Sequence, residues 1–178
     1  MNARGVHDHG RHGGCCLFCM GRAIDWSDLA GLGEGALGGA VGTAAFTGWM
    51  KGAQRMGLLG ELPPRKIART ALEKLTPDGA PSETAIEWTT ALTHLGFGVV
   101  TGAFFGVISR RAGVKIPGAV QGAVWGSVVW AASYAGWVPA LDIMPPPQRD
   151  RPDRPWVMFL GHLIFGGLLG AIAGRSKR

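Results

Sequence analysis

The chain has 178 residues, a length typical of one domain, with thirty glycines, seven tryptophans and a net charge of +6. Only 17% of its residues are charged, against about a quarter in an average soluble domain. The basic residues lie at segment ends and in loops, with no basic patch interleaved with aromatic residues, so we exclude nucleic-acid binding. Charged side chains are absent from four stretches, residues 35–50, 88–109, 116–141 and 155–174.

These uncharged stretches predict membrane-spanning helices. Three of them reach about 20 residues, the length of helix that crosses ~30 Å of hydrocarbon. The alternative is a soluble bundle of buried helices, with which the modest mean hydropathy of +0.16 is compatible. However, four nearly uncharged helices leave no polar face to meet water. We therefore predict an all-α integral membrane four-helix bundle.

The N-terminal residues 1–24 are polar, rich in glycine and histidine, and are expected to be a disordered tail. They hold metal-ligand residue types, but the spacing matches no zinc pattern, so we predict no metal site and no disulfide framework. Met20 offers an alternative start. The ligand types in question are His7, His9, His12, Cys15, Cys16 and Cys19.

A first unit is predicted over residues 25–111, with helices at 29–59, 64–75 and 84–111. Asp25 or Ser27 would cap the first helix, which consecutive prolines end. The short middle helix places its apolar residues on one face, as in a helix lying at a membrane surface. Thr84 and Glu87 have the spacing of a capping box for the third helix.

A second unit is predicted over residues 117–174, with helices at 117–138 and 156–174 and a basic tail at 175–178. Residues 88–106 align without a gap on residues 156–174, and nine of the nineteen positions are identical. Such identity indicates an internal duplication. Each copy follows a glycine-rich helix, an acidic residue and a double proline. We therefore expect two tandem two-helix repeats, related by a pseudo-two-fold axis along the membrane normal.

Glycine recurs at every fourth position in all four long helices, which predicts close packing of helix backbones. In the first predicted helix the stripe is Gly31, Gly35 and Gly39. The candidate packing glycines of the other three helices are Gly98, Gly102, Gly106, Gly118, Gly122, Gly126, Gly166, Gly170 and Gly174.

One histidine precedes the glycine stripe of each copy, and we take His94 and His162 as a candidate intramembrane polar site. They would serve as proton relay, metal ligand or substrate contact. The alternative is a neutral imidazole hydrogen-bonded to a carbonyl or hydroxyl group of a neighbouring helix. Two imidazoles are too few for zinc, which usually takes four ligands.

The proline loops contribute Glu61, Arg65, Asp142 and Arg149, which are candidates for a charged vestibule above the histidines. The alternative is that these charges only anchor helix ends at the headgroups. No catalytic triad, phosphate loop or dinucleotide fingerprint occurs, so we predict neither an enzyme nor a cofactor.

Residues 49–52 (WMKG) and 61–65 (ELPPR) resemble the corresponding segment of the YagU-type small inner-membrane proteins of bacteria. This resemblance implies a multi-pass protein of the bacterial inner membrane with uncharacterised activity. The basic residues crowded between the second and third predicted spans favour cytoplasmic termini.

The function we expect is the binding or passage of a small solute or ion between the repeats, with the lipid bilayer as surroundings and a homo-oligomer as the assembly. The alternative is a non-transporting structural or stress-response membrane protein, in which the glycine faces serve only packing.

Overall fold

The computed structural model describes residues 25–76 and 79–174, and these contain helices and connecting turns but no strand. The all-helical class predicted from the sequence is therefore confirmed. The histidine- and cysteine-rich segment and the basic tail 175–178 lie outside the described residues. The elements in chain order are α1 (Trp26–Arg55), α2 (Pro63–Leu75), α3 (Glu83–Ala112), α4 (Gly118–Ala132), η1 (Ser133–Trp137), α5 (Val138–Ala140), η2 (Pro147–Arg149) and α6 (Asp153–Ala173).

Capping side chains account for two of the differences from the predicted helix bounds, while α6 begins at Asp153, before the expected residue 156, without a side-chain cap. Helix α1 begins at Trp26, earlier than expected, because the Asp25 carboxylate accepts the Asp28 N–H at 3.0 Å and completes a capping box. The same helix ends at Arg55 instead of residue 59, because Gly57 adopts a left-handed φ of 77°. Helix α3 begins at Glu83, since Ser82 serves as its cap in place of Thr84.

The predicted helix 117–138 is continuous but irregular. Its first part, α4, is α-helical, and the chain then widens into the π-helical turn η1 before α5. Pro139 lacks the N–H that would bond the carbonyl group of residue 135 in a regular α-helix, so the ladder is interrupted at this turn. The segment extends to Ala140 and presents Ser133, Tyr134 and Trp137 from the widened turn.

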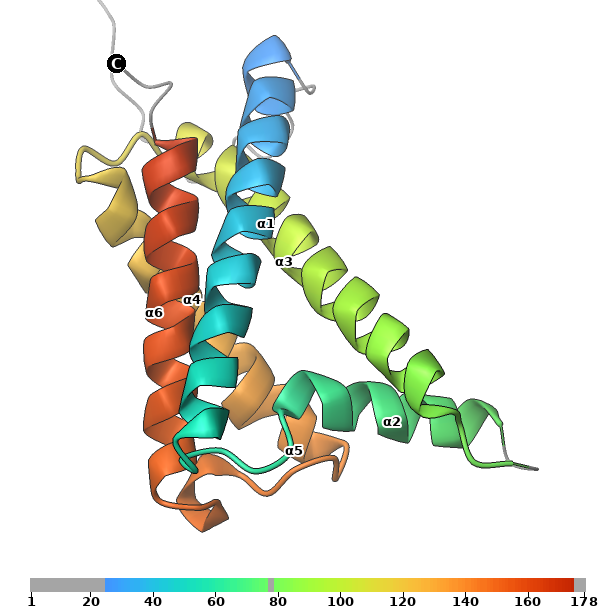
Figure 1. Cartoon of the computed structure of the whole chain (residues 1–178). Coiled ribbons are helices and arrows are strands. Elements are labelled where there is room, and N and C mark those ends of the chain that lie inside the picture. The colour runs from blue at the N-terminus through green and yellow to red at the C-terminus, as the bar shows by residue number, and fades with distance from the viewer. Residues whose placement is uncertain (1–24, 77–78, 175–178) are drawn as a thin grey trace, which may run out of the picture.

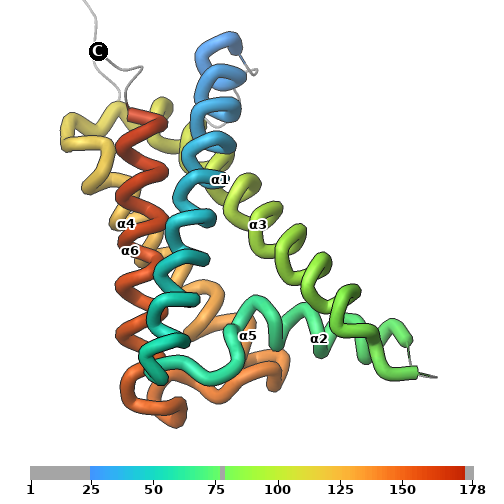
Figure 2. The backbone as a smooth tube through the Cα atoms, viewed as in Figure 1, coloured from blue at the N-terminus to red at the C-terminus, as the bar shows by residue number. Residues whose placement is uncertain are grey.

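The long helices follow one another in the spatial order α3, α1, α6, α4 (Figure 1). Helix α1 packs against both α3 and α6, and α6 packs against α4, whereas α3 and α4 touch each other only sparsely. Helix α2 crosses below the diverging ends of α1 and α3 and contacts α3, which the backbone trace of Figure 2 makes clear.

Glycines set the two closest helix crossings. A Cβ atom on Gly39 would collide with the carbonyl oxygen of Gly98, and one on Gly122 would collide with that of Gly166. Eight of the nine candidate packing glycines in α3, α4 and α6 would likewise bring a Cβ atom into collision with the neighbouring helix, whereas Gly174, the C-cap of α6, approaches Gly118 less closely. Beyond Gly98 the bulkier Phe46 and His94 stand between α1 and α3, and the two helices splay apart (Figure 1).

Within residues 25–76 and 79–174, two helices, α3 and α6, are long and apolar enough to cross a membrane. They differ in how they sit in the fold, because α6 is buried over about half of its most apolar window and α3 over 22%. Large apolar side chains of α3 and α4 are exposed along the uncharged stretches. Examples are Leu92, Val100, Phe104, Val124 and Val128.

Candidate functional site

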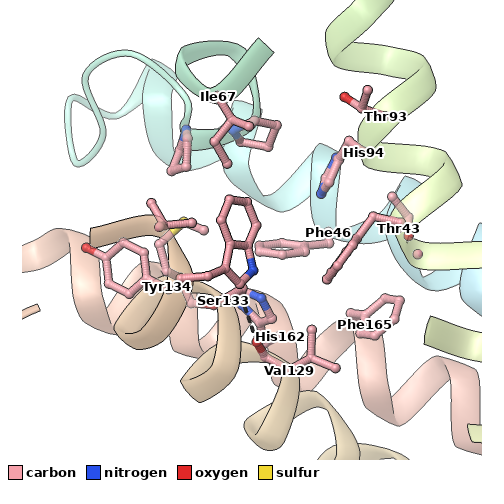
Figure 3. A pocket seen from close by; sticks show the side chains of 17 residues that line it. Thr43, Phe46, Ile67, Thr93, His94, Val129, Ser133, Tyr134, His162 and Phe165 are labelled. Atoms are coloured by element: carbon pink, nitrogen blue, oxygen red, sulfur yellow. Dashed lines mark hydrogen bonds between the residues drawn. The ribbon is translucent and has the colours of Figure 1, made fainter. Parts of the chain in front are cut away.

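A cavity of about 200 Å³ lies where α3 diverges from α1. Side chains from every helix except η2 line it, and Figure 3 shows them converging on a common space. Both candidate histidines are among them. None of the lining side chains is charged; most are apolar, and the exceptions besides the histidines are Thr43, Thr93, Ser133 and the polar edges of Tyr134 and Trp137.

His94 is held by a hydroxyl group of the neighbouring helix α1. Its Nδ1 lies 3.3 Å from Oγ1 of Thr47, and that hydroxyl donates its hydrogen to the carbonyl oxygen of Thr43 at 2.9 Å. A threonine hydroxyl has one hydrogen, and the carbonyl group of Thr43 takes it, so we assign the proton of the neutral His94 ring to Nδ1, with Oγ1 of Thr47 as its acceptor. The Nε2 atom of His94 is therefore a hydrogen-bond acceptor.

His162 has the same tautomer, but a different partner fixes its proton on Nδ1. Its Nδ1 lies 2.7 Å from the carbonyl oxygen of Met158, one turn back in α6, and a carbonyl oxygen can only accept. Nδ1 therefore donates, and Nε2 of His162 is also left as an acceptor. The side chain of His162 is buried, with 7% of the residue exposed.

Phe46 separates the two imidazoles. Its ring centroid lies 5.8 Å from that of His94 and 4.7 Å from that of His162, edge-on in both cases. Figure 3 shows Phe46 between the two histidines. No set of three or more His, Cys, Asp or Glu residues with metal-site geometry occurs among residues 25–76 and 79–174. The histidines are therefore arranged as two separate hydrogen-bonding groups in one apolar cavity.

Tyr134 of the cavity wall belongs to a buried polar cluster that sequence reasoning did not identify. The hydroxyl group of Tyr134 donates to Oδ2 of Asp150 at 2.5 Å, and Arg154 pairs with Oδ1 at 2.7 Å. The side chains of Asp150 and Arg154 are 2% and 12% exposed. The available signal was the single tyrosine of the chain, placed in an uncharged stretch and followed by a charged loop.

The four candidate vestibule residues lie outside the cavity wall. Glu61 and Arg65 form an ion pair with each other at 3.8 Å, and Arg65 also pairs with Glu83 at the start of α3. Asp142 and Arg149 are exposed on the loop between α5 and α6. The residues that α2 contributes to the cavity wall are apolar, namely Pro63, Pro64 and Ile67.

Over the part of the chain that the structure describes, the fold is all-helical, with two helices long and apolar enough to span a membrane and an uncharged pocket between the helices. The chain belongs to the family described as "Protein of unknown function (DUF1440)", which it matches over residues 55–169. No curated protein and no solved structure matches the chain significantly. The matched region runs from the end of α1 through most of α6 and includes His94, His162, Tyr134 and Asp150.

Proposed function

We propose that this protein is an integral membrane protein of two tandem helix pairs, which binds a small uncharged solute in the cavity between the pairs. The first pair is α1 with α3, and the second is α4 and its extension with α6. The observation that carries the proposal is the cavity itself, to which each pair contributes one histidine from aligned positions of the duplicated segment.

Membrane embedding is supported by where the apolar side chains point. Val100 and Phe104 of α3 are 53% and 60% exposed, and Val124 of α4 is 59% exposed. In water such an apolar surface would drive association, whereas lipid covers it at no cost. The resemblance of residues 61–65 to YagU-type proteins favours the bacterial inner membrane. The basic residues crowded in the loop between α3 and α4 favour cytoplasmic termini.

Equivalent contacts in the two pairs support the tandem repeat. Gly98 of α3 meets Gly39 of α1, and its counterpart Gly166 meets Gly122 of α4. One step along the stripe, Gly102 meets Gly35 and the matching Gly170 meets Gly118. Both pairs thus cross at the same register of the duplicated helix.

The lining favours binding over ion conduction. Burying an ion without a charged partner is costly, and the cavity wall contains no charged side chain. Phe46 stands between the two imidazoles and interrupts a direct path from one to the other. We therefore propose a binding protein rather than a channel.

Saturable binding in nanodiscs tests the proposal, with tryptophan fluorescence as the signal and 1-naphthol as the first probe. We expect Ser133→Phe, which fills the cavity, to abolish binding that exceeds partition into empty nanodiscs. Ser127→Phe is the matched control, because Ser127 also donates to a carbonyl one turn back in α4 but does not line the cavity. Absence of saturable binding by the parent protein would contradict the proposal.

The rival function, a structural membrane protein without a ligand, is favoured by one observation. The glycine faces are already used within the chain, so packing alone could explain their presence. Proteoliposomes separate these functions from transport: we expect no proton leak from the parent, His94→Ala or His162→Ala. A leak that depends on either histidine would favour passage of ions instead.

A further inference from the structure

The cavity offers hydrogen-bond acceptors almost exclusively. Three lining hydroxyl groups already donate their hydrogen to a backbone carbonyl oxygen one turn back. These hydrogen bonds are Thr43 to Gly39, Thr93 to Thr89 and Ser133 to Val129. Tyr134 donates to the Asp150 carboxylate. Each of these hydroxyl groups keeps lone pairs but has no hydrogen left to give.

The two imidazoles follow the same rule. Both Nδ1 protons are committed, one to Thr47 and one to Met158, which leaves both Nε2 lone pairs without a partner among the residues that the structure describes. Neither Nε2 is a fully enclosed unpaired atom, and both histidines line the cavity. Among the described residues that line the cavity, Trp137 has an indole N–H group without an acceptor, and this residue is 38% exposed.

The cavity opens sideways. Three of its lining residues are exposed, namely Thr93 and Phe97 on α3 and Trp137 on η1, whereas Pro63 and the α6 residues Met158 and Phe165 are buried. The opening therefore lies between α3 and η1, where the helices make few contacts, and not at an end of the bundle. In the proposed membrane orientation, this opening faces the hydrocarbon.

We infer that the ligand is a neutral, largely apolar molecule with a hydrogen-bond donor, such as a hydroxyl or N–H group, which enters from the bilayer between α3 and η1 and donates to Nε2 of His94 or His162. This inference rests on the proposed function and adds the ligand class. Buried acceptors left unpaired are costly, so a molecule that brings a donor is favoured over one that brings only acceptors. Anions are disfavoured, because no cation lines the cavity.

The test compares four probes that share the naphthalene ring system, each measured in nanodiscs: 1-naphthol, naphthalene, 1-methoxynaphthalene and 1-naphthoate. Empty nanodiscs correct for partition into lipid. We expect 1-naphthol to bind roughly tenfold more tightly than naphthalene or 1-methoxynaphthalene, as one hydrogen bond to a buried acceptor implies, and 1-naphthoate to bind most weakly. Phenylalanine at either histidine keeps a ring but removes the acceptor, so at least one of His94→Phe and His162→Phe should erase the preference for the donor.

A second variant separates acceptor chemistry from shape. Thr47→Val removes the group that fixes the proton on Nδ1 of His94, so the ring can move its proton to Nε2. We expect the preference for 1-naphthol over 1-methoxynaphthalene to shrink. Thr101→Val is the matched control, because the Thr101 hydroxyl bonds only carbonyl oxygens of its own helix and Thr101 does not line the cavity. Its probe preference should equal that of the parent.

The outcomes distinguish this inference from the proposal on which it rests. Equal binding of all neutral probes, lost in Ser133→Phe, would overturn the donor requirement and leave solute binding intact. A preference for 1-methoxynaphthalene would overturn the assigned tautomers. No saturable binding of any probe would overturn both the inference and the proposed function.

Discussion

At the scale of single residues, the contacts of individual glycines decide which positions tolerate a side chain. Gly39 and Gly33 both lie in α1 and differ only in what surrounds them. A Cβ atom on Gly39 would strike the backbone of Gly98, while one on Gly33 would have nothing within 4 Å. The two positions therefore provide a matched pair.

We predict that Gly39→Ala destabilises the protein by about 1–3 kcal/mol, because a backbone carbonyl cannot move aside as a side chain can. Gly33→Ala should be neutral or stabilising by up to about 1 kcal/mol, since alanine is the better helix former. Thermal unfolding in detergent measures both. Equal losses at the two positions would mean that the close crossing of α1 and α3 is not formed.

The buried cluster behind the cavity leads to a second prediction at this scale. Asp150→Asn keeps an acceptor for Tyr134 but leaves Arg154 without its buried counter-charge, at an expected cost of about 3 kcal/mol. Tyr134→Phe removes one hydrogen bond and should cost about 1 kcal/mol. Adding Arg154→Met to Asp150→Asn should recover part of the loss. A larger loss for Tyr134→Phe than for Asp150→Asn would contradict this assignment.

The sequence predicted the positions of the cavity histidines but not their partners. Duplication marked His94 and His162, whereas Thr47 and Phe46 belong to α1, far away in the chain and without a distinguishing pattern. Such partners depend on the crossing angle of the helices, which glycine spacing alone does not define. For the same reason the link between Tyr134 and Asp150 needed the structure.

At the scale of elements, helix α2 is attached to α3 by exposed charges and by buried apolar contacts. Arg65 and Arg69 pair with Glu61, Glu83 and Glu87 in a network whose side chains are 28–71% exposed. Exposed ion pairs contribute little and weaken in salt. Next to Arg65 on the same side of α2, Ala68 is only 2% exposed, so we expect apolar packing to contribute more than the charges to the position of α2.

We predict that Arg65→Ala lowers stability by less than about 1 kcal/mol at low ionic strength, and that the difference disappears in about 1 M NaCl. Lys66→Ala serves as the control, because Lys66 has no ion pair among the described residues and should be insensitive to salt. Denaturant unfolding at two salt concentrations gives the comparison. A large loss that survives high salt would show that the charges, and not Ala68, hold α2.

Helix bounds were predictable where the side-chain signal was strong and less so where a backbone effect intervened. The double proline was expected to end the first helix, but it opens α2 instead, and α1 already ends at Arg55 because of the left-handed conformation of Gly57. The π-helical turn at residues 133–137 was not predicted, because uncharged helix formers on both sides masked the effect of Pro139. That turn supplies three residues of the cavity wall, so the local irregularity shapes the site.

For the whole molecule, membrane embedding requires that the uncharged outer faces of α3 and α4 contact lipid. Val100 and Val128 are each 53% exposed and lie within the uncharged stretches of the two helices. Asp142, by contrast, is exposed on the loop after α5. A water-soluble thiol reagent should therefore reach a cysteine at position 142 but not one at position 100 or 128 while lipid is present.

The most direct measurement is cysteine labelling in membranes with a charged, water-soluble maleimide. Single cysteines replace Val100, Val128 or Asp142 in a chain whose three native cysteines are changed to serine. We predict that Asp142→Cys reacts once the reagent reaches both faces of the membrane, whereas Val100→Cys and Val128→Cys react only after detergent is added. Rapid labelling of all three positions in undissolved membranes would contradict a lipid-embedded protein.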